Sequence, residues 1–389
     1  MEVVILAIAR FRSDKKEAMS KNFVNLAESL TENGHQIIAV SPTGFNSCVE
    51  IEQHTFRDDS CYESLFEGGM NLIRLCKILN KLAETRPKAQ INLHIATPIE
   101  LMLIFFFLSS QHHKRTTVSI WQSYLTFEEF RLNKRYFLKN GLGYLHLFLF
   151  NSFVSAPLYK WLLGYFHQVV VHSNYQKSQL SKTKTTIHFI QNGVFSEYFS
   201  PPVITKNKRK KTLLYIGHAK PSKGVDSLIE LAAILKQRAN LEFELTLCLS
   251  GFGDQKSIEK QVFVNGLDSH IEFKENIDVG IEMARADLLV LPLRTCVGTS
   301  LTPNLVVEAL SCGLPIAIPE FEQLSDVVQF GCNAIKIDLG NLEESAKAIE
   351  MCFQLDQLEE LSENQFKQFK ANYTLEKFTS GYSQILGLE

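Results

Sequence analysis

The stretch from Cys296 to Ala317 constrains the fold most, because it combines a loop, a helix with clear ends and a strand. Thr302 can cap a helix that begins at Pro303, since a threonine hydroxyl accepts from a free backbone N–H and proline suits the first turn. Gly313 is placed to end that helix. The apolar run at 287–292 is short enough for a buried parallel strand. The pattern therefore predicts a strand, loop, helix and strand of an α/β sheet.

In such a unit the start of the helix lies at the carboxyl edge of the sheet, where free N–H groups and the helix dipole favour an anion. Glu308 is the one carboxylate in this otherwise apolar helix. An unpaired carboxylate is costly to bury, so Glu308 needs a partner. It is either a solvated residue or partner of a structural cation, or it accepts from ligand hydroxyls, such as those of a nucleotide ribose.

The stretch resembles the Glu-x7-Glu signature of the retaining GT-B glycosyltransferases of family 4. Glu308, Ala309, Gly313 and Pro315 match, whereas Ser300 stands where that family has its first glutamate. The resemblance implies an α/β fold of two facing Rossmann-like domains, with a C-terminal helix that crosses back to the first. It also implies a hexosyltransferase that uses a UDP- or GDP-linked sugar as donor and retains its configuration, with neither a cofactor nor a metal ion.

The length of 389 residues predicts two domains. Prolines and a basic run at 201–211 indicate a solvated linker. We therefore expect an acceptor-side domain over 1–200, a nucleotide-sugar domain over 201–371 and a crossover helix over 372–389. The eight cysteines form no C-x-x-C pair, which favours reduced thiols.

The apolar run at 1–10 is too short for a signal peptide and lacks a basic leader, so we expect a cytoplasmic protein. Residues 1–200 carry a net charge of +5 and the remainder −7. This asymmetry hints that the first half faces an anion. We expect no nucleic acid as a partner.

Residues 130–163 are both basic and aromatic. Arg131, Lys134, Arg135 and Lys139 share one helical face, which is typical of a segment on an anionic membrane surface. That interpretation places the protein at the inner face of the membrane, with a lipid-linked acceptor. The alternative is an ordinary domain helix followed by a core helix.

In the first half, strand, helix, glycine and strand over 1–40 indicate a Rossmann-like unit. The family usually has a Gly-Gly loop there, but Glu-Ala occupies 17–18. His94 follows a probable strand, and an active-site histidine of the family often ends the next one. Trp121 and Gln122 stand at that position. Gln122 is then a catalytic or a structural residue, and Trp121 stacks on a sugar ring or belongs to the core; His94 and Trp121 are the acceptor-side candidates.

In the second half, Gly217 ends a buried strand and begins a segment similar to the family's Gly-Arg-x4-Lys-Gly element. Lys223 and Gly224 match it, and His218 replaces the arginine. The resemblance implies that Lys223 neutralises the donor diphosphate, although a lysine before a helix is usually just solvated. His218 gives up the bidentate fork of an arginine.

Further donor contacts follow from the same resemblance. Asn276 and the backbone of Ile277 lie where family members recognise the base, and Glu308 is the expected ribose ligand. The remaining positions are expected near the phosphates or the sugar: Ser300, Thr302, Pro303, Asn304 and Leu305.

A second class of protein stays open because several positions depart from the family pattern: 17–18, Trp121, Gln122, His218 and Ser300. This is a degenerate GT-B protein that binds a nucleotide sugar or acts as a scaffold without turnover. An epimerase of the same architecture would need a set of carboxylates and a histidine that the sequence does not clearly provide. Nothing indicates the phosphate or pyridoxal-phosphate site of a phosphorylase.

Overall fold

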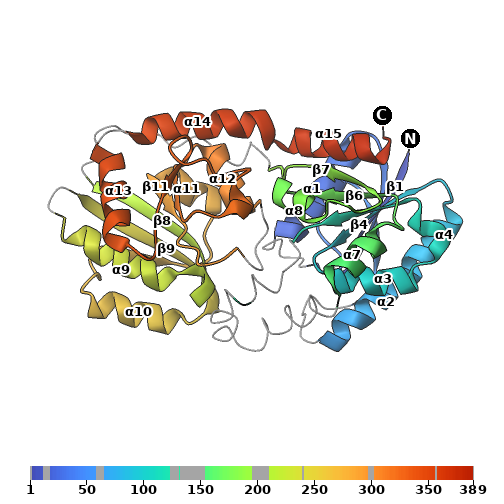
Figure 1. The fold of residues 1–389 in the computed structure, drawn as a ribbon, viewed down its shortest axis with the longest axis horizontal. Helices are drawn as coiled ribbons and strands as arrows, with labels where there is room; N and C mark the ends of the chain where they lie inside the picture. The colour runs from blue at the N-terminus through green and yellow to red at the C-terminus, as the bar shows by residue number, and fades with distance from the viewer. Residues whose placement is uncertain are drawn as a thin grey trace.

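The computed structural model describes residues 2–11, 18–57, 65–122, 131, 154–194, 210–238, 241–296, 302–354 and 357–388. Figure 1 shows two α/β domains side by side, joined along one edge by the last two helices. Each domain is built on a parallel sheet. The two facing Rossmann-like domains predicted from the sequence are confirmed.

The first domain has a seven-stranded sheet in the order β3-β2-β1-β4-β5-β6-β7. Its first strand is a continuous apolar run because helices cover both faces of the sheet, whereas the strands at 90–95 and 116–120 also carry buried polar residues. The strands are β1 (Val3–Ile8), β2 (Gln36–Ser41), β3 (Glu52–Thr55), β4 (Gln90–Ile95), β5 (Thr116–Ile120), β6 (Gln168–Val171) and β7 (Thr186–Phe189). The helices are α1 (Ala18–Glu32), α2 (Leu65–Thr85), α3 (Pro98–Phe107), α4 (Ser110–His113), α7 (Ala156–Leu163) and α8 (Asn174–Gln179).

The second domain has a six-stranded sheet in the order β10-β9-β8-β11-β12-β13. The strands are β8 (Lys210–Ala219), β9 (Glu242–Gly253), β10 (Ile271–Lys274), β11 (Leu288–Val290), β12 (Ile316–Ile318) and β13 (Ala334–Lys336). The helices are η1 (Pro221–Lys223), α9 (Val225–Lys236), α10 (Gln255–Val264), α11 (Val279–Arg285), α12 (Asn304–Cys312), η2 (Glu322–Leu324), α13 (Leu342–Gln354), α14 (Gln357–Asn372) and α15 (Leu375–Leu386). Among the helices of the described residues, none is both long and apolar enough to cross a membrane.

The last helix leaves the second domain and packs on the first. α14 lies against α12, and after a break at 373–374 α15 lies against α1. Val194 pairs with Thr374 at this break. A Cβ on Gly193 would lie 2.7 Å from the carbonyl oxygen of Thr374, so only glycine lets the two segments approach so closely.

The beginning of α12 corrects one detail of the sequence prediction. The cap position falls on Pro303 rather than on Thr302, and the helix begins at Asn304. The hydroxyl of Thr302 instead donates to the carbonyl oxygen of His172 in the first domain, at 2.6 Å. The predicted end is confirmed, because Gly313 closes the helix with φ 67°.

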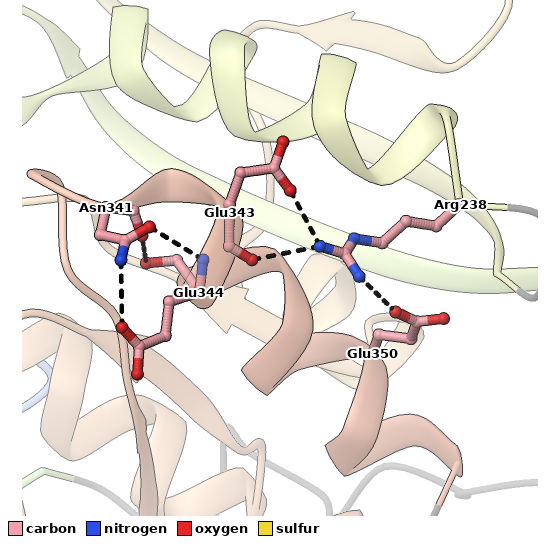
Figure 2. Close-up of polar contacts among 6 residues, drawn as sticks. Arg238, Asn341, Glu343, Glu344 and Glu350 are labelled. Atoms are coloured by element: carbon pink, nitrogen blue, oxygen red, sulfur yellow. Dashed lines mark hydrogen bonds and ion pairs between the residues drawn. The ribbon is translucent and has the colours of Figure 1, made fainter.

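An arginine fixes α13 to the outer side of the second domain (Figure 2). The guanidinium of Arg238, just after α9, donates to Glu350 Oε2 at 2.8 Å and to Glu343 Oε2 at 3.1 Å. Asn341 caps α13 by accepting from the backbone N–H of Glu344 at 3.2 Å. These contacts hold α13 against α9.

A stack of aromatic rings fills the first domain beneath α15. The ring centroids of His94 and Trp121 are 5.8 Å apart, and those of Trp121 and His172 are 4.0 Å apart. Trp121 Nε1 donates to His94 Nδ1 at 2.9 Å, and His172 Nδ1 donates to the carbonyl oxygen of Ile190 at 2.9 Å. The Nε2 atoms of both histidines are buried without a hydrogen-bond partner among the described residues. Neither imidazole can therefore accept a proton without a large cost.

Acid should destabilise the fold through this stack. Burial lowers the pKa of His94 to about 3, and the neighbouring His172 adds to the shift. Burial also lowers the pKa of His172 to about 4, against the opposing effect of its hydrogen bond to Ile190. Below about pH 6.5 the unfolded chain binds protons that the folded chain does not. We expect the free energy of unfolding to fall by about 1.4 kcal/mol per pH unit for each histidine between pH 6.5 and these values.

Urea unfolding measured from pH 7 to pH 4.5 checks this expectation. His94→Gln should reduce the pH slope, because glutamine can still accept from Trp121 and does not titrate. His167→Gln, at an exposed position, is the control and should keep the wild-type slope. Equal slopes for all three proteins would contradict the assignment to the stack.

Candidate functional site

The strand order of the second sheet reverses between β8 and β11. In open α/β sheets, ligands bind at the carboxyl ends of the strands beside such a reversal. The end of β8 contains Gly217 and His218 and leads into η1 with Lys223. The loop after β11 is described as far as Cys296, and α12 begins beyond it at Asn304. The topology thus brings two of the sequence-predicted elements to one edge of the sheet.

Two residues hold the loop that carries Lys223. Gly224 adopts φ 69°, and a Cβ there would lie 1.9 Å from the carbonyl oxygen of Pro292. Arg294 donates to the carbonyl oxygen of Pro221 at 3.0 Å and to Asp226 Oδ2 at 2.7 Å. The loop after β8 is therefore attached to the loop after β11. Arg294 was not predicted, although a basic residue just past a buried strand was a usable signal.

Lys223 is half-buried at this strand reversal. Burial lowers the pKa of its ammonium from the ordinary value, the negative charge that the thiol of Cys296 can carry opposes the shift, and the ammonium of Lys220 adds to it. An ammonium that has lost part of its hydration gains more from an anionic ligand than an exposed one does. The ring of His218 is held through Nδ1 by a hydrogen bond with the hydroxyl of Ser250 at the end of β9.

Glu308 is buried, and its partner comes from the other domain. Glu308 Oε1 accepts from the ammonium of Lys21, which lies near the start of α1. The next residue along, Asn22, exchanges two hydrogen bonds of 3.2 Å with Asn304. Of the two interpretations of Glu308, the structure supplies the cation partner, and ribose binding stays a prediction.

Lys21 was missed because its partner is 287 residues away in the sequence. The family resemblance concerns only 17–18, where Glu-Ala replaces the Gly-Gly loop. Ala18 is the first residue of α1, and Glu17 lies outside the described residues. A lysine in the first turn of the helix that follows this loop was the available signal.

The start of α12 is bound to the first domain at a second point. Besides the hydrogen bond from Thr302 to His172, the side-chain amide of Asn192 donates to the carbonyl oxygen of Thr302 at 2.7 Å. Asp326, after η2, accepts from both the backbone N–H and the side chain of Asn174, at 2.6 and 2.8 Å. The carboxyl edge of the second sheet is therefore in direct contact with the first domain.

The other predicted residues are placed as follows. Asn276 is exposed and adopts φ 51°, in the left-handed region, while Ile277 packs against the core of the second domain. Gln122 is half-buried at the end of a described segment. Trp121 and His94 are only 2% and 1% exposed, so the structure favours the core interpretation of Trp121 and places His94 with it. Ser300 lies outside the described residues.

Comparisons with known proteins concern the family and the fold. A family model described as Glycosyl transferases group 1 matches residues 210–354, the part that contains Lys223 and Glu308. No curated protein sequence shows a significant match to the chain.

Several solved structures have the same fold. The chain is similar to sucrose-phosphate synthase from Thermosynechococcus elongatus, with a TM-score of 0.76, 14% identity and coverage of 100% of this chain and 99% of that one. It is similar to a glycosyltransferase from Rickettsia africae ESF-5, with a TM-score of 0.72, 14% identity and coverage of 100% and 98%. Anabaena HepE in complex with UDP-glucose gives a TM-score of 0.69, 15% identity and coverage of 99% of both chains. The chain therefore has the GT-B fold, with a Glycosyl transferases group 1 domain over 210–354.

Gly224→Ala tests whether the conformation of the Lys223 loop matters. Gly331→Ala is the matched control, because Gly331 has φ 75° but open space around its Cα. The control should lose about 1–2 kcal/mol of unfolding free energy from backbone strain alone. Gly224→Ala should lose more, because its Cβ collides with Pro292. Calorimetry with UDP and GDP gives a second readout. If the wild type binds one of these nucleotides, Gly224→Ala should bind the same nucleotide more weakly. Equal losses in both variants would show that the loop does not need this close approach.

The pair of Lys21 and Glu308 is testable with a double-mutant cycle. Lys21→Met, Glu308→Gln and the double variant should give a coupling energy of about 1 kcal/mol in unfolding free energy, since Lys21 is about one-third exposed and water screens the pair. The pair of Lys336 and Glu320 is the control. Both of its side chains are more than half exposed, so a smaller coupling energy is expected. A coupling energy of zero between Lys21 and Glu308 would contradict this contact between the domains.

Proposed function

We propose that the chain is a retaining glycosyltransferase of family 4. It would transfer a hexose from a UDP- or GDP-linked sugar to a glycan or lipid-linked acceptor, without a metal ion, in polysaccharide or glycolipid biosynthesis. The observation that carries the proposal is the placement of two elements at the strand reversal. There a partly dehydrated lysine, Lys223, shares one sheet edge with the start of the helix that carries the buried Glu308.

The chemistry explains why these groups belong together. When the bond between the anomeric carbon and the phosphate oxygen breaks, its electron pair stays on the nucleoside diphosphate. The ammonium of Lys223 and the free N–H groups at the start of α12 would stabilise this charge without a metal ion. The acceptor hydroxyl would form the new bond to the anomeric carbon and pass its proton to an oxygen of the departing diphosphate.

The remaining roles follow the same arrangement. Glu308 would accept from ribose hydroxyls through the oxygen that Lys21 does not engage, and His218 would donate a hydrogen bond near the phosphates. Asn276 and the backbone of Ile277 would meet the base. Gln122 would face the acceptor from the first domain. HepE has been seen with UDP-glucose, which supports a nucleotide sugar as donor.

A non-catalytic nucleotide-sugar-binding partner is the alternative that the comparisons do not favour. Incubation with a panel of labelled sugar nucleotides separates the two. Transfer or sustained hydrolysis of one donor supports the enzyme. Tight binding without turnover supports the alternative and overturns the proposed reaction.

Glu308→Ala and Lys223→Ala are expected to weaken donor binding by about 10- to 100-fold each, the typical worth of a hydrogen bond to a charged group. Both should abolish transfer while the circular dichroism spectrum stays that of the wild type. Lys347→Ala, at an exposed position on α13, is the control and should keep wild-type affinity. Wild-type donor affinity in both site variants would show that the donor binds elsewhere.

A further inference from the structure

Exposed aromatic side chains gather on one face of the first domain, formed by the end of α3, by α7 and by the turn after it. Within this group Phe106 is 70%, Trp161 50% and Tyr165 39% exposed. Their rings lie close together: the centroids of Trp161 and Tyr165 are 4.8 Å apart, and Phe105 lies 5.1 Å from Tyr165 and 5.8 Å from Trp161. Phe107 and Leu158 extend the same exposed group. We call this group the aromatic face.

The aromatic face differs from ordinary exposed apolar residues because its side chains form one contiguous group. Single exposed apolar side chains need no explanation, but a contiguous group on a monomer marks an interaction surface. Figure 1 shows α3 and α7 next to each other, on the side of the first domain away from α15. The aromatic face is thus not the one that the crossover helix covers.

The charges around the aromatic face are nearly all positive. Residues 154–194 are all described and contain four lysines but no aspartate or glutamate. Over 98–122 the only acidic residue is Glu100, which is buried and paired with Arg10. The two segments that form the aromatic face therefore carry lysines and no exposed carboxylate, although Glu84 on the neighbouring α2 is exposed near His112. This composition favours an anionic partner.

Two lysines lie beside the rings. The ammonium of Lys160 on α7 donates to the carbonyl oxygen of Ser181 at 3.1 Å, which holds the loop of 181–184 against this helix. At the end of α7, a Cβ on Gly164 would lie 3.4 Å from the Cβ of Lys184. Lys182 and Lys184 are both exposed. The loop therefore places two cations at the border of the aromatic face.

We propose that the aromatic face, with the loop of 181–184, binds the surface of an anionic lipid membrane. Tryptophan and tyrosine suit the interface between headgroups and acyl chains, because one end of each ring system is apolar and the other can remain hydrated. The lysines meet the anionic headgroups. A second copy of the chain fits less well, since a symmetric contact would bring the same lysines together.

The proposal changes the membrane contact expected from the sequence. Of 130–163, the described residues are Arg131 and 154–163, so Lys134, Arg135 and Lys139 lie outside the structure's description. The described contact surface instead includes the end of α3, which was not predicted from the sequence. Membrane binding needs no sugar nucleotide, so its failure would leave the proposed transfer reaction standing.

Flotation of the full chain with vesicles tests the proposal. We expect binding to vesicles that mix phosphatidylcholine with phosphatidylglycerol, little binding to phosphatidylcholine alone, and release by added salt. The double variant Lys182→Glu and Lys184→Glu should reduce the bound fraction at least about tenfold, since each basic residue near an anionic surface contributes about 1 kcal/mol. Phe106→Ser should reduce binding to the same mixed vesicles.

The second domain provides matched controls on α10. Phe263 is 74% exposed, and Lys256 and Lys260 are exposed on the same helix. Phe263→Ser and the double variant Lys256→Glu and Lys260→Glu should keep wild-type flotation. An equal loss in these controls, or a wild-type protein that does not float with anionic vesicles, overturns the proposal. Concentration-dependent dimers in analytical ultracentrifugation that Phe106→Ser abolishes would make the aromatic face a contact between two copies, and would overturn it as well.

Discussion

The contacts at the start of α12 connect every other part of the candidate site. This short segment belongs to the second domain, yet Thr302, Asn304 and Glu308 each bond to the first domain, through His172, Asn22 and Lys21 respectively. The same segment lies at the strand reversal between β8 and β11. A ligand that binds at this helix therefore meets groups that already hold the two domains together. Binding and the arrangement of the domains are linked for this reason.

The segment at 373–374 forms a second junction between the domains. Val194 and Thr374 pair where β7 and α14 end, and the hydroxyl of Tyr373 accepts from Gln191 at 3.2 Å and donates to the carbonyl oxygen of Asp326 at 2.8 Å. α15 then anchors the chain end through Tyr382, whose hydroxyl donates to Ser119. The pair of Val194 and Thr374 is a backbone contact, and Tyr373 and Tyr382 are both fully buried, whereas the ion pair of Lys21 and Glu308 is partly exposed. We therefore expect the segment at 373–374 to open less readily than this ion pair.

Local patterns predicted the fold well, because they depend on neighbouring residues. The apolar run at 287–292 gave β11, and Gly313 ended α12 since the left-handed conformation favours glycine. The contacts of the site are not local. Thr302 bonds to a carbonyl 130 residues away instead of capping its own helix, and Glu308 pairs across 287 residues. The burial of Trp121 likewise depends on α15, which lies more than 250 residues further along the chain. No spacing rule in the sequence contains these distances.

The departures from the family pattern acquire a physical meaning when they are placed in the structure. His218 replaces a fixed guanidinium, and its ring is held by a hydrogen bond with Ser250 on β9. The chain has not lost positive charge at the junction, however, because Lys21 brings an ammonium from the first domain to the carboxylate of Glu308. Because Lys21 belongs to the first domain, its ammonium reaches the start of α12 only while the two domains are in contact. In this chain, neutralising an anionic ligand and joining the two domains would therefore be parts of one event, whereas an arginine on the second domain alone would keep them separate.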